Sequence, residues 1–147
     1  MPSIIKRRVL APMKISREVH LRHILTSDIS LPMTAELRYD TADPYAVRAT
    51  FHTGAEEAVA WVFARDLLAE GLHRPTGTGD VRVWPARSSE LGTVSIVLST
   101  PEGEALLEAP VRALESFLKQ THAAVPPGTE HQYFDLDAEL ARILAES

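Results

Sequence analysis

The chain of 147 residues contains no cysteine, which excludes disulfides, thiolate zinc sites and a cysteine nucleophile. It has no apolar run approaching the roughly 20 residues of a membrane span, and its first residues lack the apolar core of a secretory signal. The glycine-rich stretch 77–80 has no Gly-Lys-Ser/Thr ending for phosphate, and no Gly-x-Ser-x-Gly elbow surrounds Ser88, Ser89 or Thr93. We therefore expect a cytoplasmic protein that is not an enzyme and uses no cofactor or small-molecule substrate.

Metal-binding patterns are missing as well. No two of the six histidines stand four residues apart on an expected helix, as zinc-binding pairs do. Asp40 and Asp43 lack the central glycine and the closing glutamate of a calcium loop. We expect these aspartates to cap a turn, and we expect His20 and His52 on strand surfaces.

The composition is that of one ordinary globular domain, with 45% hydrophobic residues and a net charge of -5. The charge is uneven, because residues 1–50 hold 8 Lys/Arg against 5 Asp/Glu and residues 101–147 hold 3 against 9. Such asymmetry can orient a partner. The acidic total argues against bulk binding of nucleic acid through its phosphates.

Alternating residues predict an antiparallel run of strands in the first half. Residues 33–39 and 45–51 alternate with period two on either side of a turn, and residues 17–24 alternate before them. Tyr39 and Tyr45 share the apolar register, which favours the core for both. Residues 58–63 are apolar on both faces, which indicates a central or covered strand.

The second half switches between helical and strand patterns. The expected elements are a helix at 64–70, strands at 81–85, 91–99 and 104–108, a helix at 110–122 and a last helix from 135 onward. Gly71 followed by Leu72 suits a left-handed stop of the first helix. The fold class is therefore α+β, with antiparallel sheets in the order ββββ-α-βββ-αα covered by helices.

One domain is expected over residues 17–147. Residues 1–16 show no clean period, so we expect a loosely ordered arm or an added strand there. Near the other end, two prolines precede Gly128, and this turn is expected to need a positive φ that a Cβ would resist. A substitution at Gly128 should disturb geometry more than chemistry.

Trp84 and Arg82 are the candidates for contact with a partner. They share one face of strand 81–85, opposite Val81 and Val83, so an exposed Trp84 is the best single candidate for an interface anchor. A second interpretation stays open, in which Arg38, Arg48 and Arg82 join aromatic side chains in a surface for single-stranded nucleic acid.

Several stretches resemble the SsgA-like family, the sporulation and cell division regulators of filamentous actinobacteria. They are 35–57 (A-E-L-R-Y-D-T-A-D-P-Y-A-V-R-A-T-F-H-T-G-A-E-E), 61–85 (W-V-F-A-R-D-L-L-A-E-G-L-H-R-P-T-G-T-G-D-V-R-V-W-P), 99–110 (S-T-P-E-G-E-A-L-L-E-A-P), 125–131 and 134–140. The resemblance extends from about Arg17 to the end of the chain and carries no catalytic motif.

The resemblance implies a non-enzymatic protein that recruits the tubulin-like division protein FtsZ to future septum sites during sporulation. It further implies that the protein acts with SsgA, promotes FtsZ polymerisation and localises to the division septum, with membrane contact only through a partner. The implied fold is similar to that of Whirly and mitochondrial RNA-binding proteins, assembled as a homotrimer.

Overall fold

The computed structural model describes residues 12–52, 58–86, 92–134 and 143–145. The elements are β1 (Lys14–Ile24), β2 (Ser30–Asp40), β3 (Ala46–His52), β4 (Ala58–Ala64), α1 (Arg65–Gly71), β5 (Val81–Pro85), β6 (Thr93–Thr100), β7 (Gly103–Pro110), α2 (Val111–Ala124) and the 3₁₀ turn η1 (Glu130–Gln132). No described helix has the length and apolar character needed to cross a membrane.

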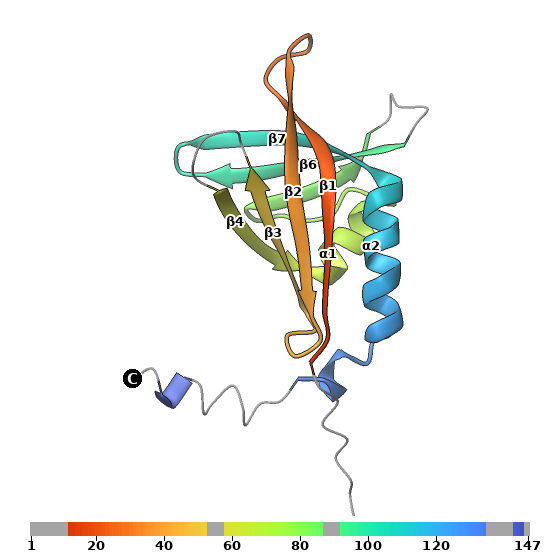
Figure 1. Cartoon of the computed structure of the whole chain (residues 1–147). Coiled ribbons are helices and arrows are strands. Elements are labelled where there is room, and N and C mark those ends of the chain that lie inside the picture. Colours follow the sequence, from red (N-terminus) through yellow and green to blue (C-terminus); the bar gives the residue numbers. More distant parts are fainter. Residues whose placement is uncertain (1–11, 53–57, 87–91, 135–142, 146–147) are drawn as a thin grey trace, which may run out of the picture.

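All the described strands belong to one antiparallel sheet of seven strands, in the order β4-β3-β2-β1-β7-β6-β5. The α+β class is therefore confirmed, with a single sheet in place of the expected several. Figure 1 shows that β5, β6 and β7 run across the direction of β1 to β4, so the sheet bends where β1 meets β7. Only the last residues of β1 make this junction, from Arg22↔Glu108 to Ile24↔Leu106.

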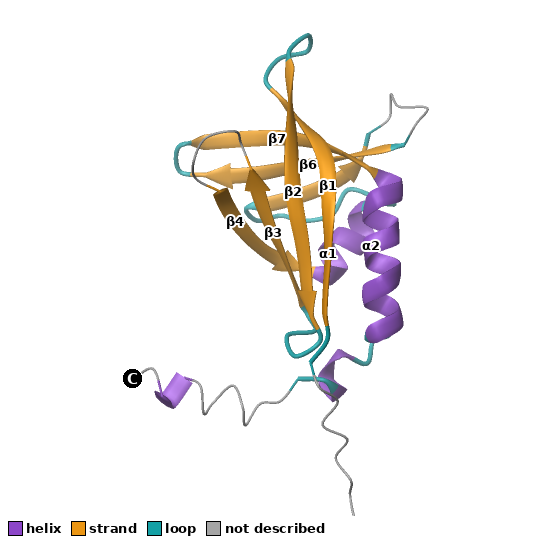
Figure 2. Cartoon of the chain, viewed as in Figure 1, coloured by secondary structure: helices purple, strands orange, loops and turns teal. Residues whose placement is uncertain are grey.

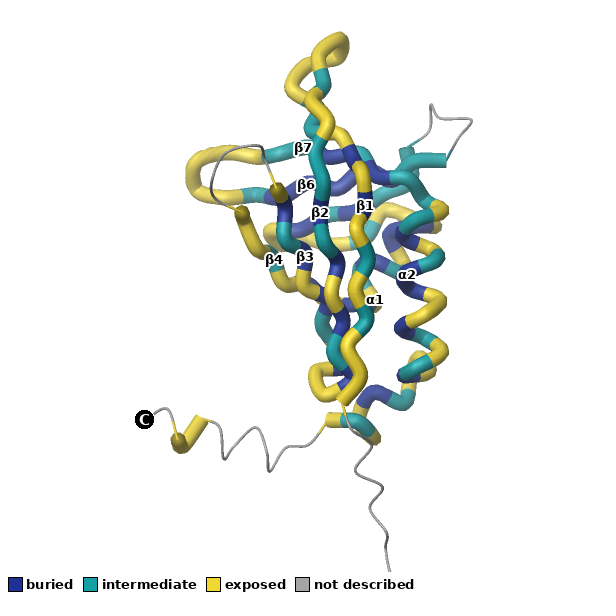
Figure 3. Tube along the Cα trace, viewed as in Figure 1, coloured by how far each residue is buried: buried dark blue, intermediate teal, exposed yellow. Residues whose placement is uncertain are grey.

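The bend encloses the core between the two halves of the sheet and the helices (Figures 2 and 3). Alternate residues of each strand turn inward, as period-two patterning requires. The buried apolar residues of the strands include Val19, Leu21, Ala35, Leu37, Tyr39, Val47, Ala49, Phe51, Phe63, Val83, Val94, Ile96, Leu98, Leu107 and Ala109. Helix α2 adds a stripe of Leu114, Phe117 and Leu118, which covers the side of β1 and β7.

Gly71, the last residue of α1, is a glycine for a different reason from the one expected. Its φ is not among the positive values of the described glycines, so it makes no left-handed stop. A Cβ on Gly71 would instead lie 2.4 Å from the Cβ of Val83 in β5. The glycine is therefore required by the close approach of α1 to β5. Gly128 does have the expected positive φ, +87°, with open space around it.

Two expectations for the core are wrong. β4 is an edge strand of the sheet and is mostly exposed, whereas its two apolar faces had indicated a central or covered place. Tyr45 is 50% exposed because the turn ends at this residue and β3 begins only at Ala46, so the strand register does not include it. Tyr39 is buried as expected.

The ends of the chain are described in part. β1 begins at Lys14, and the Met13 backbone N–H donates to the Thr41 hydroxyl at 2.9 Å, so residues 13–16 pair with the β2–β3 region. The rest of stretch 1–16 lies outside the described residues, and the division into arm and domain stays a prediction. The last expected helix falls mostly on 135–142, also outside them; residues 143–145 are helical.

Candidate functional site

Trp84 and Arg82 lie on the outer face of the β5–β6–β7 half of the sheet, as their register predicted. Trp84 is half-buried rather than exposed, and its cross-strand partner is Ser95. Arg82 pairs with Val97, and its guanidinium donates to the Glu104 carboxylate. Their cross-strand partners on the same face, Ser95 and Val97, are both buried.

The three arginines of the nucleic-acid interpretation do not come together. Arg38 and Arg48 are direct cross-strand partners in β2 and β3, whereas Arg82 lies in β5 at the far end of the sheet. With Lys14, the first two line a polar hollow of about 300 Å³ that also contains Asp40 and Asp43. Arg38 is paired with Glu36 at 3.4 Å. This hollow is of mixed charge, which weakens it as a phosphate site.

The expected surface positions of His20 and His52 are confirmed, since both are exposed. Asp40 caps its turn as expected, accepting the Ala42 backbone N–H at 2.9 Å. Across the described part of the chain, no three His, Asp or Glu side chains gather as a metal cluster.

The strand β4 carries an exposed apolar edge that the sequence analysis did not identify. Its seven residues, Ala58–Ala64, contain no charge and no proline, and Val59 and Val62 are 46% and 54% exposed. Val59 and Trp61 lie on the inner face with Phe63, while Val62 lies on the outer face. An uncharged, exposed edge of this kind is a template for pairing with another chain.

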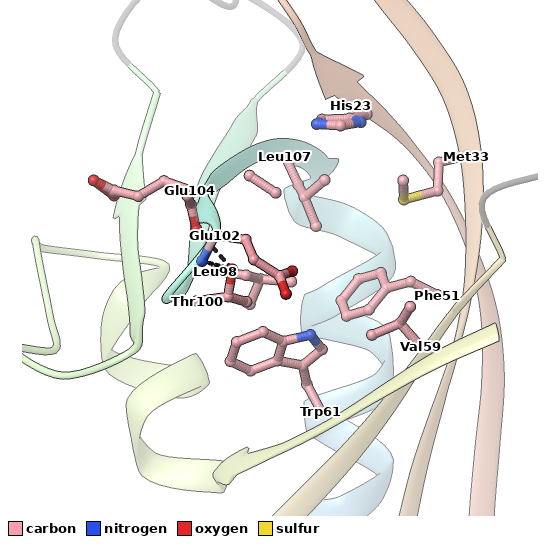
Figure 4. Close-up of a pocket in the computed structure, with 12 residues that line it drawn as sticks. His23, Met33, Phe51, Val59, Trp61, Leu98, Thr100, Glu102, Glu104 and Leu107 are labelled. Carbon is pink, nitrogen blue, oxygen red and sulfur yellow. Dashed lines mark hydrogen bonds between the residues drawn. The ribbon is translucent and has the colours of Figure 1, made fainter. Parts of the chain in front are cut away.

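Beside this edge, an apolar cavity of about 320 Å³ opens between β4 and the β6–β7 hairpin. Its lining includes Met33, Phe51, Val59, Trp61, Leu98 and Leu107, with His23, Thr100, Glu102 and Glu104 among the polar residues. Figure 4 shows the Glu102 side chain pointing toward the Trp61 indole, while the Glu104 side chain points away. The cavity therefore combines an aromatic floor with one acidic group at its mouth.

A buried arginine fixes the end of β4. Arg65 is 1% exposed and its guanidinium donates to the backbone carbonyls of Thr121 (3.1 Å) and Val125 (2.8 Å) at the end of α2. It also pairs with Glu130 at 3.0 Å and lies 5.0 Å from the centre of the Tyr39 ring. No signal in the sequence indicated that Arg65 is buried, because the hydrogen-bond partners of its side chain lie more than 50 residues away along the chain.

The protonation of this cluster follows from its hydrogen bonds. The backbone N–H of Glu130 itself, the Arg65 guanidinium and the Gly128 N–H lower the pKa of the Glu130 carboxyl. Burial raises the pKa of Tyr39 to about 12, and its hydroxyl donates to the Pro44 carbonyl at 2.8 Å. Burial, then Arg65, lowers the pKa of His122. The cluster is therefore a charged, bonded anchor between β2, α1, α2 and η1.

Comparison with known proteins identifies close relatives. The family model described as Streptomyces sporulation and cell division protein SsgA matches residues 33–130. The chain is 77% identical, over 90% of its own length and 97% of the relative's, to the sporulation-specific cell division protein SsgB of Streptomyces coelicolor. It is 46% identical to the protein of that name from Thermobifida fusca, covering 89% of this chain and 95% of the relative.

Solved structures agree with these relatives. A structure of SsgB, from work on mutations that correlate to longitudinal cell division during sporulation of Streptomyces coelicolor, superimposes with a TM-score of 0.81 at 75% identity, over 84% of this chain and 97% of the other. The crystal structure of an SsgA-like sporulation-specific cell division protein from Thermobifida fusca also gives a TM-score of 0.81, at 45% identity, over 88% and 95%.

Proposed function

The chain belongs to the SsgA family of sporulation and cell division proteins, and from this premise we propose that it is a non-enzymatic adaptor for FtsZ. In this proposal it recruits the tubulin-like division protein to future septum sites during sporulation and promotes its polymerisation. The observation that carries the proposal is the 77% identity to SsgB over 97% of that protein's length.

The surface of the molecule supports a role in protein binding. Side chains of Val59 and Val62 on β4 are exposed, and so are Leu25, Ile29 and Leu31 at the tip of the β1–β2 hairpin. Figure 3 shows the exposed tip of the β1–β2 hairpin projecting beyond the rest of the sheet. Large exposed apolar side chains on one strand or one hairpin tip are typical of surfaces that contact other chains. Several such groups would suit an adaptor that contacts more than one partner.

We infer that the adaptor acts as a homotrimer together with SsgA, in the cytoplasm at the division septum. A closed oligomer presents several copies of one FtsZ-binding surface, so weak contacts become strong through effective concentration. Membrane contact would then be indirect, through a partner. Sedimentation of the purified protein tests the oligomer, and a mass other than that of a trimer would exclude it.

We assign Trp84 and Arg82 to the FtsZ-contacting surface. Trp84 is half-buried on the outer face of β5, so part of its side chain remains accessible to a partner, as an interface anchor requires. Arg82 is held beside it by Glu104, so both side chains are oriented before a partner arrives.

A second candidate is a single-stranded nucleic-acid-binding regulator with a Whirly-like fold. The observation that favours it is the pairing of Arg38 with Arg48 beside Lys14 in one polar hollow. The net charge of -5 and the carboxylates in the same hollow weigh against it.

Co-sedimentation with FtsZ polymers separates the two candidates. Purified protein is spun with FtsZ and GTP over a salt series, with and without single-stranded DNA as competitor, and with GDP as the control for polymer dependence. Salt-tolerant enrichment in the pellet that DNA does not reduce supports the adaptor. Steeply salt-dependent binding to the DNA itself would favour the second candidate.

Two variants locate the surface. Trp84→Ala is expected to reduce the enrichment strongly, because it removes the anchor while Val83 and the core remain. Tyr45→Ala is the control, since it removes an aromatic that is 50% exposed from a turn on a different part of the molecule. Equal loss in both variants, or none in either, would remove Trp84 from the FtsZ-contacting surface.

A further inference from the structure

We propose that the groove between β4 and the β6–β7 hairpin binds an extended segment of a partner chain. The segment adds as a strand to the free edge of β4, places an apolar side chain in the cavity and sets a basic side chain against Glu102. The proposal concerns a surface distinct from Trp84 and Arg82, and it holds whether or not the partner is FtsZ.

The first step is the backbone of β4. Within the residues that the structure describes, β4 is hydrogen-bonded to β3 on one side and to no strand on the other. A free edge offers alternate N–H and C=O groups in the spacing that an extended peptide matches. Proteins usually protect such an edge with charge or proline, and Ala58–Ala64 has neither. The free edge of β4 is therefore open to pairing with a strand of another chain.

The second step is the cavity, which supplies room for a side chain of the added strand. Val59 and Trp61 form the wall of the cavity on the β4 side, directly beside the free edge. Phe51, Leu98 and Leu107 provide the apolar floor and far wall (Figure 4). Its volume of about 320 Å³ lies at the low end for ligand sites. An aliphatic or aromatic side chain entering from the edge would bury this surface.

The third step is charge, which selects the partner's chemistry. Glu104 is already bound to Arg82 on the outer face. Glu102 is exposed, makes no ion pair within the described part of the chain, and points toward the Trp61 indole. A carboxylate and an indole that line the same cavity both attract a cation that enters it. The segment that fits therefore carries Lys or Arg two residues from its buried apolar side chain, on the same face of the added strand.

The probe is the synthetic peptide acetyl-Thr-Leu-Thr-Lys-Thr-Leu-Thr-amide, whose leucines and lysine share one face of a strand. The protein carries Trp84→Phe, so that Trp61 is the one remaining indole of the chain's two tryptophans. Titration is expected to shift the Trp61 emission saturably. A version with glutamate in place of lysine is expected to bind more weakly, and Glu102→Gln is expected to abolish that preference.

Variants on the two faces of β4 supply the matched controls. Val59→Lys places a charge in the groove and is expected to weaken binding about tenfold, a loss of roughly 1.4 kcal/mol. Val62→Lys carries the same charge on the same strand but on the outer face, and it should keep the affinity within about twofold. Both side chains are about half exposed, so equal melting temperatures are expected and are measured alongside.

The backbone contact is tested separately. Methylation of alternate peptide nitrogens in the probe removes the N–H groups that would pair with β4, and it is expected to abolish binding. The proposal is overturned if the Trp61 emission shows no saturable change, if Val59→Lys and Val62→Lys weaken binding equally, or if the methylated peptide binds unchanged. It is also overturned if Val59→Lys lowers the sedimenting mass of the protein alone, because a second copy would then occupy the groove.

Discussion

The two edges of the sheet are built in opposite ways. β5 ends the sheet at one side, and Thr76 of the segment before it closes the middle of this edge with one bridge: the Thr76 N–H donates to the Val83 carbonyl, and the Val83 N–H donates to the Thr76 carbonyl, each at 2.9 Å. Pro85 ends the strand, and Arg82 adds a charge paired with Glu104. β4 ends the sheet at the other side with no charge or proline.

This difference between the β5 and β4 edges indicates that a partner strand would add at β4. A covered edge with charge and proline cannot extend the sheet, while an apolar edge beside a cavity can. β4 is nevertheless held firmly at its end, because Arg65 follows it directly and is anchored to α2 and Glu130. An open edge that is anchored at one end has less entropy to lose on pairing, and this favours binding.

Loss of Arg65, which anchors the end of β4, is expected to lower the free energy of unfolding more than any other change considered below. Arg65→Met removes the guanidinium from Glu130 and from two backbone carbonyls, leaving a buried carboxylate without its cation. The free energy of unfolding is expected to fall by about 3 to 5 kcal/mol, measured by chemical denaturation. The double variant Arg65→Met/Glu130→Leu should be less destabilised than the single one, since no charge is left buried. A single variant as stable as the unmodified chain would show that the cluster does not anchor β4.

Acid weakens the same anchor by a smaller amount. Because the folded-state pKa of Glu130 lies below its ordinary value, its stabilisation is present above that ordinary value and is lost as pH falls through the lowered one. Unfolding free energies measured from about pH 7 down to about pH 3 should therefore fall more steeply in the unmodified chain than in Glu130→Gln. Identical slopes in the two proteins would contradict the assignment.

Closure of the β5 edge also depends on the contact between α1 and β5. Gly71→Ala would bring a methyl group within 2.4 Å of buried Val83, so one element must move. Overpacking of this kind is expected to cost about 1 to 3 kcal/mol in denaturation experiments. Gly79→Ala is the matched control, because a Cβ there meets nothing within 4 Å. A similar loss in both variants would point to helix or loop propensity rather than to the contact with Val83.

These elements also mark how far sequence reasoning reached. The alternation in β2 and β3 identified their inner faces because one face is wet and the other dry. The prediction for β4 was wrong. A strand that is apolar on both faces is expected to be covered, but the sequence does not say whether the same chain or a partner covers it. Sequence reasoning also failed at Gly71, where the cause is a side chain of β5 that packs against it, and at Arg65, whose partners lie far along the chain.

Breaking the bridge between Thr76 and Val83 at the β5 edge should lower the free energy of unfolding by less than Gly71→Ala does. Thr76→Pro removes the N–H that donates to the Val83 carbonyl, and a loss of about 1 kcal/mol is expected for one backbone hydrogen bond. Thr76→Val is the matched control, because it keeps that N–H and removes only the hydroxyl that donates to the Arg74 carbonyl at 2.8 Å. Hydrogen exchange at the Val83 amide reports the edge directly: faster exchange is expected in the proline variant, and unchanged exchange would mean that Thr76 does not close it.

The charge on the covered edge should matter least for stability. Arg82 and Glu104 have side chains that are 42% and 57% exposed, so water and salt screen their attraction. Arg82→Gln is therefore expected to change the free energy of unfolding by less than about 1 kcal/mol. Its effect should appear instead in FtsZ co-sedimentation, if Arg82 belongs to the contact surface with Trp84. A variant that loses stability but keeps full enrichment in the pellet would reverse this assignment and make Arg82 a structural part of the edge.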